Sequence, residues 1–271
     1  MQTTHIGGVG IGGDNPVRLM GVINISPESF FHGSFVPSGE VAAHAHMMID
    51  RGAEIIDIGA RSTAPDSRPI SISEECDRLK RSLSELVGSG IPISVDTMHA
   101  GALEVALRYD IDAINDIHGL ADESFASLAA DSGLPVIAMA AIHEPGDACG
   151  ADATKAALAG VLDRCEQYGI VDLILDPGIG RWVPGRSFND DWELCRRFSE
   201  FSVFDRPLLG AISRKSFIGD LLGKPAEERL FGTLALTALL IEAGAGMIRT
   251  HDIVPTFDAI RVSERVLRRR P

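Results

Sequence analysis

The sequence is poor in cysteine, in positive charge and in long apolar runs. Its four cysteines, Cys76, Cys149, Cys165 and Cys195, have no spacing that suggests a zinc or redox site, and they are expected to be reduced thiols in a cytoplasmic protein. The net charge of −13 argues against nucleic acid or an acidic membrane surface as the main partner. An anionic substrate would therefore depend on a local cluster of cations.

The chain also lacks an apolar stretch that could cross a membrane. The most apolar later segment, residues 234–241, is interrupted by Thr237 and closed by Glu242, and no signal peptide opens the chain. The 271 residues are 45% hydrophobic, which is ample for a large core. No linker, low-complexity tract or charge block marks a boundary, so one domain over residues 1–271 is expected.

What the chain does have is a repeated alternation of short apolar runs and amphipathic segments. Such alternation is typical of parallel strands joined by crossover helices. Eight units in this length favour an α/β fold of the (β/α)8 or TIM-barrel type, although periodicity alone also fits a doubly wound open sheet. The predicted strands cover residues 18–23, 54–58, 92–95, 112–114, 135–139, 172–175, 207–212 and 246–248. The predicted helices include residues 41–51, 73–87, 101–109, 151–168 and 227–243.

The first residues predict a short N-terminal hairpin outside the main fold. Residues 5–13 alternate apolar residues with glycine before a turn at Asp14, Asn15 and Pro16. The glycines could suggest a nucleotide-binding loop, but no helix-forming segment follows them, so the hairpin is favoured.

Polar residues follow nearly every predicted strand. In a barrel the carboxyl ends of all strands meet at one rim, so these side chains would share one site. An Asp after a strand is often only a turn or a cap, but such a series of coincidences is less plausible than one shared site. Ser213 is expected to cap a helix, so that Arg214 and Lys215 reach the rim beside backbone N–H groups and form an anion site. The residues that follow the strands are Asn24, Asp57, Asp96, Asn115, Asp116, Met139, Asp176, Ser213, Arg214, Lys215, Arg249, His251 and Asp252.

An ordered set of motifs resembles those of dihydropteroate synthase. Each motif is weak alone, but together they run in order over about residues 18 to 265 and are specific. The motifs are MGVINISPESF (20–30), GAEIIDIG (52–59), SVDT (94–97), INDI (114–117), LDPGIG (175–180), SRKSF (213–217) and RTHD (249–252).

The resemblance implies a pterin-binding transferase. It would condense 6-hydroxymethyl-7,8-dihydropterin diphosphate with p-aminobenzoate or a related arylamine and release pyrophosphate with Mg²⁺. The pathway would be folate or methanopterin-type pterin biosynthesis. Members of this family are sulfonamide targets and tend to be homodimers.

The resemblance also implies a role for each rim residue at the pterin. Asp176 would accept two parallel hydrogen bonds from the 2-amino-4-oxo edge, as a carboxylate does from an Arg fork. Asp96 and Asn115 would complete this edge. Lys215 would donate to the ring acceptors, and Met139 would be a polarizable wall for the ring, although a methionine at a strand end is by default a core residue.

The opposite end of the implied site would bind the diphosphate. Asn24 is the implied Mg²⁺ contact, because Mg²⁺ usually takes few protein ligands beside water and phosphate oxygens. Arg249 and His251 would supply positive charge and donors to the leaving group. The implied catalytic residues are Lys215, Arg249 and His251, and Ser62 and Thr63 complete the substrate-binding set.

Departures from the family pattern leave the arylamine open. Where the family usually has Glu-Ser-Thr-Arg-Pro, this chain has Arg-Ser-Thr-Ala-Pro at residues 61–65, so the usual loop arginine is missing. Arg61 or Arg68 would replace it, and His143 would help to cover the amine site. Added cations would favour an amine that carries a phosphate, such as a ribosylated aniline phosphate, over p-aminobenzoate.

Two other classes of function stay open. A pterin-dependent methyltransferase acting with a corrinoid protein would retain the Asp and Asn positions, but it has no need for residues 213–217 or for Arg249 and His251. A non-catalytic pterin-binding barrel would leave the cationic rim without a purpose. Because Ser213 has no evident base partner and the histidines lack metal-ligand spacing, a nucleophilic triad or a zinc site is not expected.

Overall fold

A parallel eight-stranded barrel forms the body of the molecule. The computed structural model describes residues 2–28, 35–62 and 68–267. The barrel strands are β3 (Arg18–Asn24), β4 (Ile55–Gly59), β5 (Ile93–Asp96), β6 (Ala113–Asp116), β7 (Val136–Met139), β8 (Leu173–Asp176), β9 (Leu209–Gly210) and β10 (Met247–Thr250). They pair in the order β8-β7-β6-β5-β4-β3-β10-β9, and an isolated bridge between Leu175 and Leu208 brings the two edges together. The predicted barrel is confirmed, and the open sheet is excluded.

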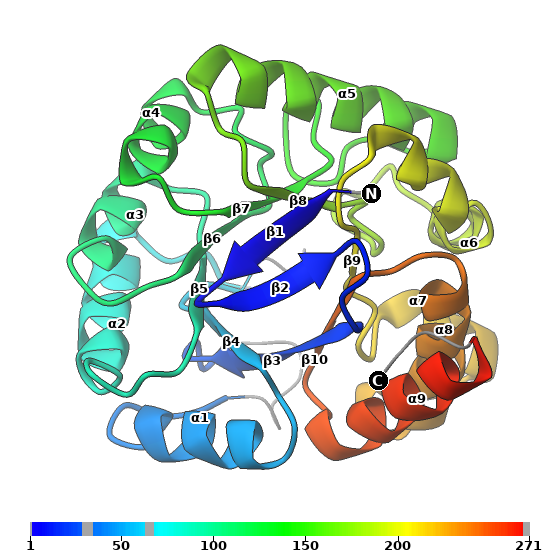
Figure 1. Ribbon diagram of the computed structural model, residues 1–271, viewed down its shortest axis with the longest axis horizontal. Coiled ribbons are helices and arrows are strands. Elements are labelled where there is room, and N and C mark those ends of the chain that lie inside the picture. Colours follow the sequence, from blue (N-terminus) through cyan, green and yellow to red (C-terminus); the bar gives the residue numbers. More distant parts are fainter. Residues whose placement is uncertain (1, 29–34, 63–67, 268–271) are drawn as a thin grey trace.

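Helices surround the barrel (Figure 1). They are α1 (Val41–Asp50), α2 (Ile72–Ser84), α3 (Ala100–Ala106), α4 (Glu123–Ser132), α5 (Gly150–Tyr168), α6 (Phe188–Arg196), α7 (Ser216–Leu222), α8 (Leu230–Glu242) and α9 (Ile253–Val266), with 3-10 turns η2 (Phe198–Phe204) and η3 (Ala226–Glu228). Side-chain caps fix several starts: Ser71 Oγ accepts from the N–H of Glu74, and Ser187 and Asp190 form a capping box. Among the described residues, no helix is long and apolar enough to span a membrane.

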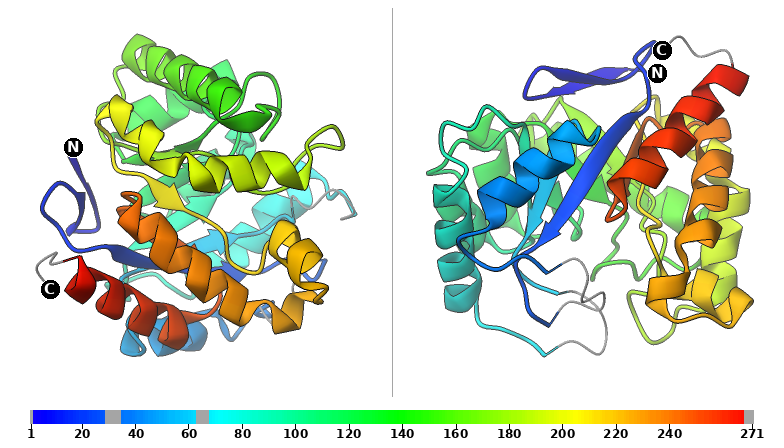
Figure 2. Two further views of the ribbon diagram at one scale, coloured as in Figure 1. Left: turned by 90° about the vertical axis from the view of Figure 1, so that its right-hand side faces the viewer. Right: turned by 90° about the horizontal axis from the view of Figure 1, so that it is seen from below.

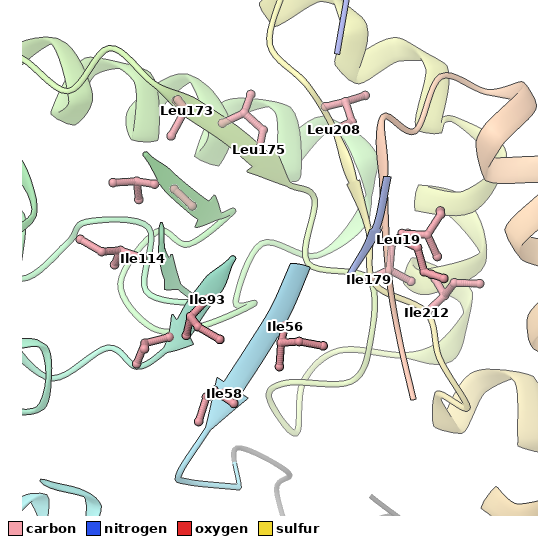
Figure 3. Close-up of a cluster of buried hydrophobic side chains, with 14 of the residues drawn as sticks. Leu19, Ile56, Ile58, Ile93, Ile114, Leu173, Leu175, Ile179, Leu208 and Ile212 are labelled. Atoms are coloured by element: carbon pink, nitrogen blue, oxygen red, sulfur yellow. The ribbon is translucent and has the colours of Figure 1, made fainter. Parts of the chain in front are cut away.

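Alternation along the strands divides the apolar side chains between two cores. Successive side chains on a strand point to opposite faces. Leu19, Ile56 and Ile114 therefore face the helices, in the layer that Figure 3 shows. Their neighbours Met20 and Ile55 face the barrel axis and fill its interior.

The hairpin closes the amino end of the barrel. Its strands, β1 (Thr3–Ile6) and β2 (Val9–Gly12), pair antiparallel, so the predicted hairpin is confirmed. It is not peripheral as expected, because Ile6 and Ile11 are fully buried in the interior core of the barrel and Thr4 Oγ1 donates to Leu173 O at 3.2 Å. Figure 2 shows the hairpin at the end of the barrel opposite the carboxyl ends of β3 and β4.

Candidate active site at the carboxyl end of the barrel

The rim side chains lie one step beyond the interior core. Residues two apart on a strand face the same way, so the residue that follows a core residue by two also faces the barrel axis. Asp57 follows the core residue Ile55 in this way, and Asp176 follows the core residue Ile174. The same spacing joins Ala113 to Asn115, Ile137 to Met139, Ala211 to Ser213 and Met247 to Arg249. Apart from Met139, the side chains along the barrel axis therefore change from apolar to polar at one level, toward its carboxyl end.

Arg249 links two carboxylates from neighbouring strands. Its Nε lies 2.7 Å from Asp57 Oδ2, and its Nη2 lies 2.9 Å from Asp96 Oδ2. Asn115 Nδ2 donates to the same Asp57 oxygen at 3.0 Å. Arg249 was expected at a separate diphosphate end of the site. The structure instead places it beside Asp96 and Asn115, which were expected to bind the pterin. Asp57 was recognised in the sequence only as a rim residue, although its fully buried side chain is central to this network.

Burial and crowding shift the charge of this network. Burial raises the pKa of Asp96 to about 7, Arg249 opposes the rise, and Asp57 adds to it. Asp57 Oδ1 is buried and makes no hydrogen bond within the described residues. Two carboxylates around a single guanidinium, one of them with an unpaired oxygen, are arranged to receive additional hydrogen-bond donors.

Asp176 and Met139 meet at the end of neighbouring strands. Asp176 is 6% exposed, and its Oδ1 accepts the N–H of Gly178 at 2.8 Å. Burial raises the pKa of Asp176, and the charges of Lys215 and Arg249 partly offset that rise. Gly178 has φ +70, and a Cβ there would lie 3.0 Å from Met139 Cγ, so the turn packs directly on the methionine. The structure therefore brings together two of the predicted pterin contacts.

Lys215 reaches the same region from the start of α7. Its Nζ lies 4.6 Å from the ring centroid of Trp182, whose Nε1 donates to Gly178 O at 2.9 Å. Burial lowers the pKa of Lys215 to about 8, with Asp176 opposing the change. Trp182 was not recognised in the sequence; the signal was an aromatic residue shortly after the Asp-Pro-Gly turn at 176–178.

His251 and Asn24 lie together at another part of the rim. His251 Nε2 lies 3.5 Å from Asn24 Nδ2, and His251 Nδ1 lies 3.0 Å from Ser213 Oγ. Burial and the nearby Arg249 lower the pKa of His251 to about 3, so its ring is neutral near pH 7. The expectation of positive charge from His251 is therefore wrong, and the expectation that Ser213 has no base beside it is corrected.

Arg214 does not face the rim, contrary to expectation. Its Nε and Nη2 bind the two oxygens of Asp252 at 2.7 Å each, and its Nη1 donates to the carbonyls of Ala226 and Glu227. The N-cap of α7 is Lys215, and its cap carries no side-chain hydrogen bond, so the predicted cap at Ser213 is wrong. The chain turns at Arg214 with φ +55, which sends consecutive side chains in different directions.

Arg61, which was expected to replace the missing loop arginine, also binds elsewhere. Arg61 Nε lies 2.9 Å from Oε2 of the buried Glu75, whose Oε1 accepts from Thr97 Oγ1 at 2.6 Å. Ser62 is partly buried, whereas Arg68 and His143 are exposed. Thr63 lies outside the described residues.

Comparisons with known proteins cover the whole barrel. A family model described as pterin binding enzyme matches residues 20–251. The chain is 35% identical over 264 residues to the dihydropteroate synthase of Escherichia coli K12, with 92% of each chain covered. Its structure resembles a Coxiella burnetii dihydropteroate synthase in complex with pteroic acid, with a TM-score of 0.86, 31% identity and 98% of each chain covered. It also resembles Yersinia pestis dihydropteroate synthase in a sulfonamide drug complex, with a TM-score of 0.88, 30% identity, and 99% of this chain and 100% of that chain covered.

Proposed function

The chain belongs to the pterin-binding enzyme family, and we propose that its barrel rim joins a dihydropterin diphosphate to p-aminobenzoate with release of pyrophosphate. It is a transferase of the dihydropteroate synthase type. Its relatives carry that name, which favours condensation over methyl transfer to a corrinoid protein. The observation that carries the site assignment is the convergence of Asp57, Arg249 and Asp96 with Asp176 and Lys215 at one level of the barrel.

The pterin would lie between Asp176 and the network around Arg249. A pterin edge carries paired N–H donors, which match a carboxylate acceptor such as Asp176. Asn115 and Asp96 would complete the contacts from β6 and β5, and Met139 would form the wall that packs on the ring. Lys215 supports this arrangement, because its charge lies close enough to Asp176 to lower the pKa of that carboxyl.

The diphosphate would lie toward Asn24 and His251. These side chains offer hydrogen-bond donors, and Arg249 and Lys215 supply the positive charge, as expected of a site that stabilises a leaving anion. When pyrophosphate leaves, the pterin ring would spread the charge on its methylene carbon, and the amine nitrogen would attack that carbon. Lys215, Arg249 and His251 would act by positioning and charge stabilisation rather than as nucleophiles.

The donor set fits Mg²⁺ that is held largely by the substrate. In the described ranges, no group of three or more His, Cys, Asp or Glu could hold a metal ion. Mg²⁺ commonly takes one or two protein oxygens together with substrate phosphates and water, and Asn24 would supply such an oxygen. The ion would neutralise charge on the diphosphate.

We infer that the arylamine is p-aminobenzoate. The salt bridge of Arg61 with Glu75 removes the main support for an amine that carries a phosphate. The Coxiella burnetii neighbour binds pteroic acid, in which p-aminobenzoate is already joined to a pterin. Ser62 and Thr63 would belong to the substrate-binding loop, and sulfonamides would compete with the amine.

We propose that the chain forms one domain and associates as a homodimer, and its free cysteines support a cytoplasmic location. The interior core joins the hairpin to strands from both halves of the barrel, which favours one domain over residues 1–271. Helices α8 and α9 expose Phe231, Leu239, Val262 and Val266 on the outside of the barrel, and a second copy would cover them.

An amine panel tests the proposed function. The full chain with Mg²⁺ would be offered dihydropterin diphosphate with p-aminobenzoate or a phosphoribosylated aniline, and pyrophosphate release would be measured. We expect higher kcat/KM with p-aminobenzoate and no change in that preference in Arg61→Lys. Preference for the phosphorylated amine would overturn the acceptor assignment, and absence of pyrophosphate release with every amine would overturn the function.

A further inference from the structure

We propose that the buried side chain of Arg186 is a positioning residue for Lys215. It fixes the two loops that surround the lysine and so directs the ammonium group toward the pterin site. The proposal rests on the proposed function, because Lys215 affects turnover only if the rim carries out the condensation. Arg186 acts through Asp191, Gly180 and Trp182, and it is not proposed to touch either substrate.

Arg186 joins two rim loops to a helix. It lies in the loop after β8 and is only 2% exposed. Its Nε and Nη2 lie 3.0 and 2.9 Å from Oδ1 of Asp191 in α6, and Asp191 is fully buried. Its Nη1 donates to the carbonyl oxygens of Gly146 and Ala148 in the loop after β7, at 3.2 and 3.3 Å. The rigid, forked guanidinium suits this task, because its N–H donors point in several fixed directions.

The first link from Arg186 to Lys215 runs through the backbone of Gly180. Asp191 Oδ1 accepts the N–H of Gly180 at 2.8 Å, so the carboxylate that binds Arg186 also fixes this glycine. Gly180 has φ +135, and a Cβ there would lie 2.8 Å from Lys215 Nζ and 3.0 Å from Lys215 Cδ. The lysine side chain therefore packs against this backbone, which the buried ion pair holds in place.

The second link runs through the indole ring of Trp182. A Cβ on Gly146 would lie 2.3 Å from Trp182 Cγ, so the ring packs directly on the backbone whose carbonyl Arg186 binds. Trp182 Nε1 donates to Gly178 O at 2.9 Å, and the ring centroid lies 4.6 Å from Lys215 Nζ. The π-electrons of an indole ring attract a cation at this distance. Both links therefore end at the same ammonium group.

A role in stability alone would give a different result. If the ion pair only stabilised the fold, its loss would lower the melting temperature without changing turnover by the folded enzyme or the surroundings of Trp182. Arg186→Lys keeps the positive charge but loses the fork. Arg186→Met combined with Asp191→Leu removes both charges together, and so leaves no uncompensated charge in the interior.

The indole N–H signals of the full-length chain report on this arrangement without substrate. The chain has two tryptophans, so a ¹H–¹⁵N spectrum contains two indole signals, and Trp192→Phe identifies that of Trp182. We expect Lys215→Met to shift the Trp182 signal, because the variant removes the cation beside the ring. Arg186→Lys and the double variant should each shift or broaden the same signal.

Single-turnover rates with dihydropterin diphosphate, p-aminobenzoate and Mg²⁺ provide the functional measurement. We expect Arg186→Lys to lower the rate roughly tenfold, because a displacement of about 1 Å can cost up to about a hundredfold. The steady-state KM values should change less than kcat. In the Lys215→Met background the same substitution should have a smaller effect, because a residue that acts through the lysine then has little left to position.

Arg197→Lys is the matched control. Arg197 lies at the other end of α6, and its guanidinium also binds several groups, the carboxylates of Glu193, Glu200 and Asp152. Its replacement by lysine likewise keeps the charge and loses the fork. We expect the Trp182 signal and the rate to stay as in the wild type.

Four outcomes would count against the proposals, and they are separable. A Trp182 signal that Lys215→Met leaves unchanged would overturn the arrangement around the lysine, even if neither Arg186 variant folds. A wild-type rate and a wild-type Trp182 signal in either folded variant would overturn the role of Arg186. An equal loss of rate with and without Lys215 would show that Arg186 does not act through the lysine. Absence of pyrophosphate release by the wild type refutes the proposed function, and with it the effect on turnover, while the indole signals still decide whether Arg186 positions Lys215.

Discussion

At the scale of single residues, burial sets the protonation of the rim. It raises the pKa of Asp96 to about 7 and lowers that of Lys215 to about 8, so both groups change charge close to neutral pH. Asp116 also has a pKa raised by burial, to about 6, but its oxygens accept the backbone N–H groups of His118 and Leu120. Asp116 therefore stabilises the turn that follows β6. The sequence pattern alone could not show whether Asp116 stabilises a turn or binds a substrate at the rim.

Asp176→Asn should remove pterin binding and leave the fold intact. An amide offers one acceptor and two donors where the pterin edge needs acceptors, and the mismatch costs about 1–3 kcal/mol or more in a buried site. We expect pterin affinity to fall at least roughly tenfold by calorimetry. A folded variant that binds pterin as the wild type does would remove Asp176 from the site. Asp172→Asn, at the exposed residue just before the same strand, is the control.

Lys215→Met should abolish most turnover and change the pH dependence of stability. The folded chain lowers the pKa of Lys215 from 10.5 to about 8, so the unfolded chain holds more protons between these values. The stability of the wild type therefore rises with pH across that window, and the variant lacks this contribution. Denaturant unfolding from pH 7.5 to 10.5 should show the wild type gaining stability relative to Lys215→Met. Parallel curves would mean that Lys215 titrates normally.

At the scale of elements, the sequence predicts the barrel strands well and the connecting loops poorly. Short apolar runs predict the positions of the strands. The rim residues can be predicted because each lies two positions after an interior core residue on the same strand. The direction of Arg214 could not be foreseen, because it depends on a left-handed backbone angle that a non-glycine residue rarely adopts. The salt bridge between Arg61 and Glu75 could not be predicted either, since a glutamate on a helix is usually exposed.

Arg214→Met should destabilise the connection between the loops after β9 and β10. The substitution leaves Asp252, whose side chain is 15% exposed, without its bidentate partner and frees two carbonyls of η3. We expect a loss of about 3 kcal/mol in the free energy of unfolding, measured with urea. Arg108→Met removes an exposed pair with Glu104 and should have little effect. Equal effects of the two substitutions would show that the Arg214 contacts do not stabilise the fold.

At the scale of the whole molecule, the closing hairpin and the candidate site lie at opposite ends of the barrel. The hairpin closes the amino end of the barrel, whereas the rim residues lie at the carboxyl end. The overall charge of −13 repels anions, so we expect binding of a diphosphate to depend on Arg249, Lys215 and the proposed Mg²⁺ at short range. The outer helices are then available for association without blocking the rim.

Association through α8 and α9 is the remaining prediction. The two helices lie side by side on the outside of the barrel (Figure 1). Between them runs a mostly apolar groove, lined by Leu234, Ala235, Ala238, Pro255, Asp258, Ala259, Val262 and Ser263. Leu239 is 58% exposed and Val262 is 64% exposed, and a twofold interface would bury both residues in each copy.

Leu239→Arg combined with Val262→Arg should convert the proposed dimer into a monomer, because four arginines would bring like charges together at the interface and would lose solvation there. Light scattering after size exclusion measures the mass of the complex. Val171→Arg, at a position that is 72% exposed just before β8, is the control and should leave the dimer intact. The rim residues described above all come from one chain, so the monomer should still bind pterin. A wild-type chain that elutes as a monomer at micromolar concentration would refute this interface.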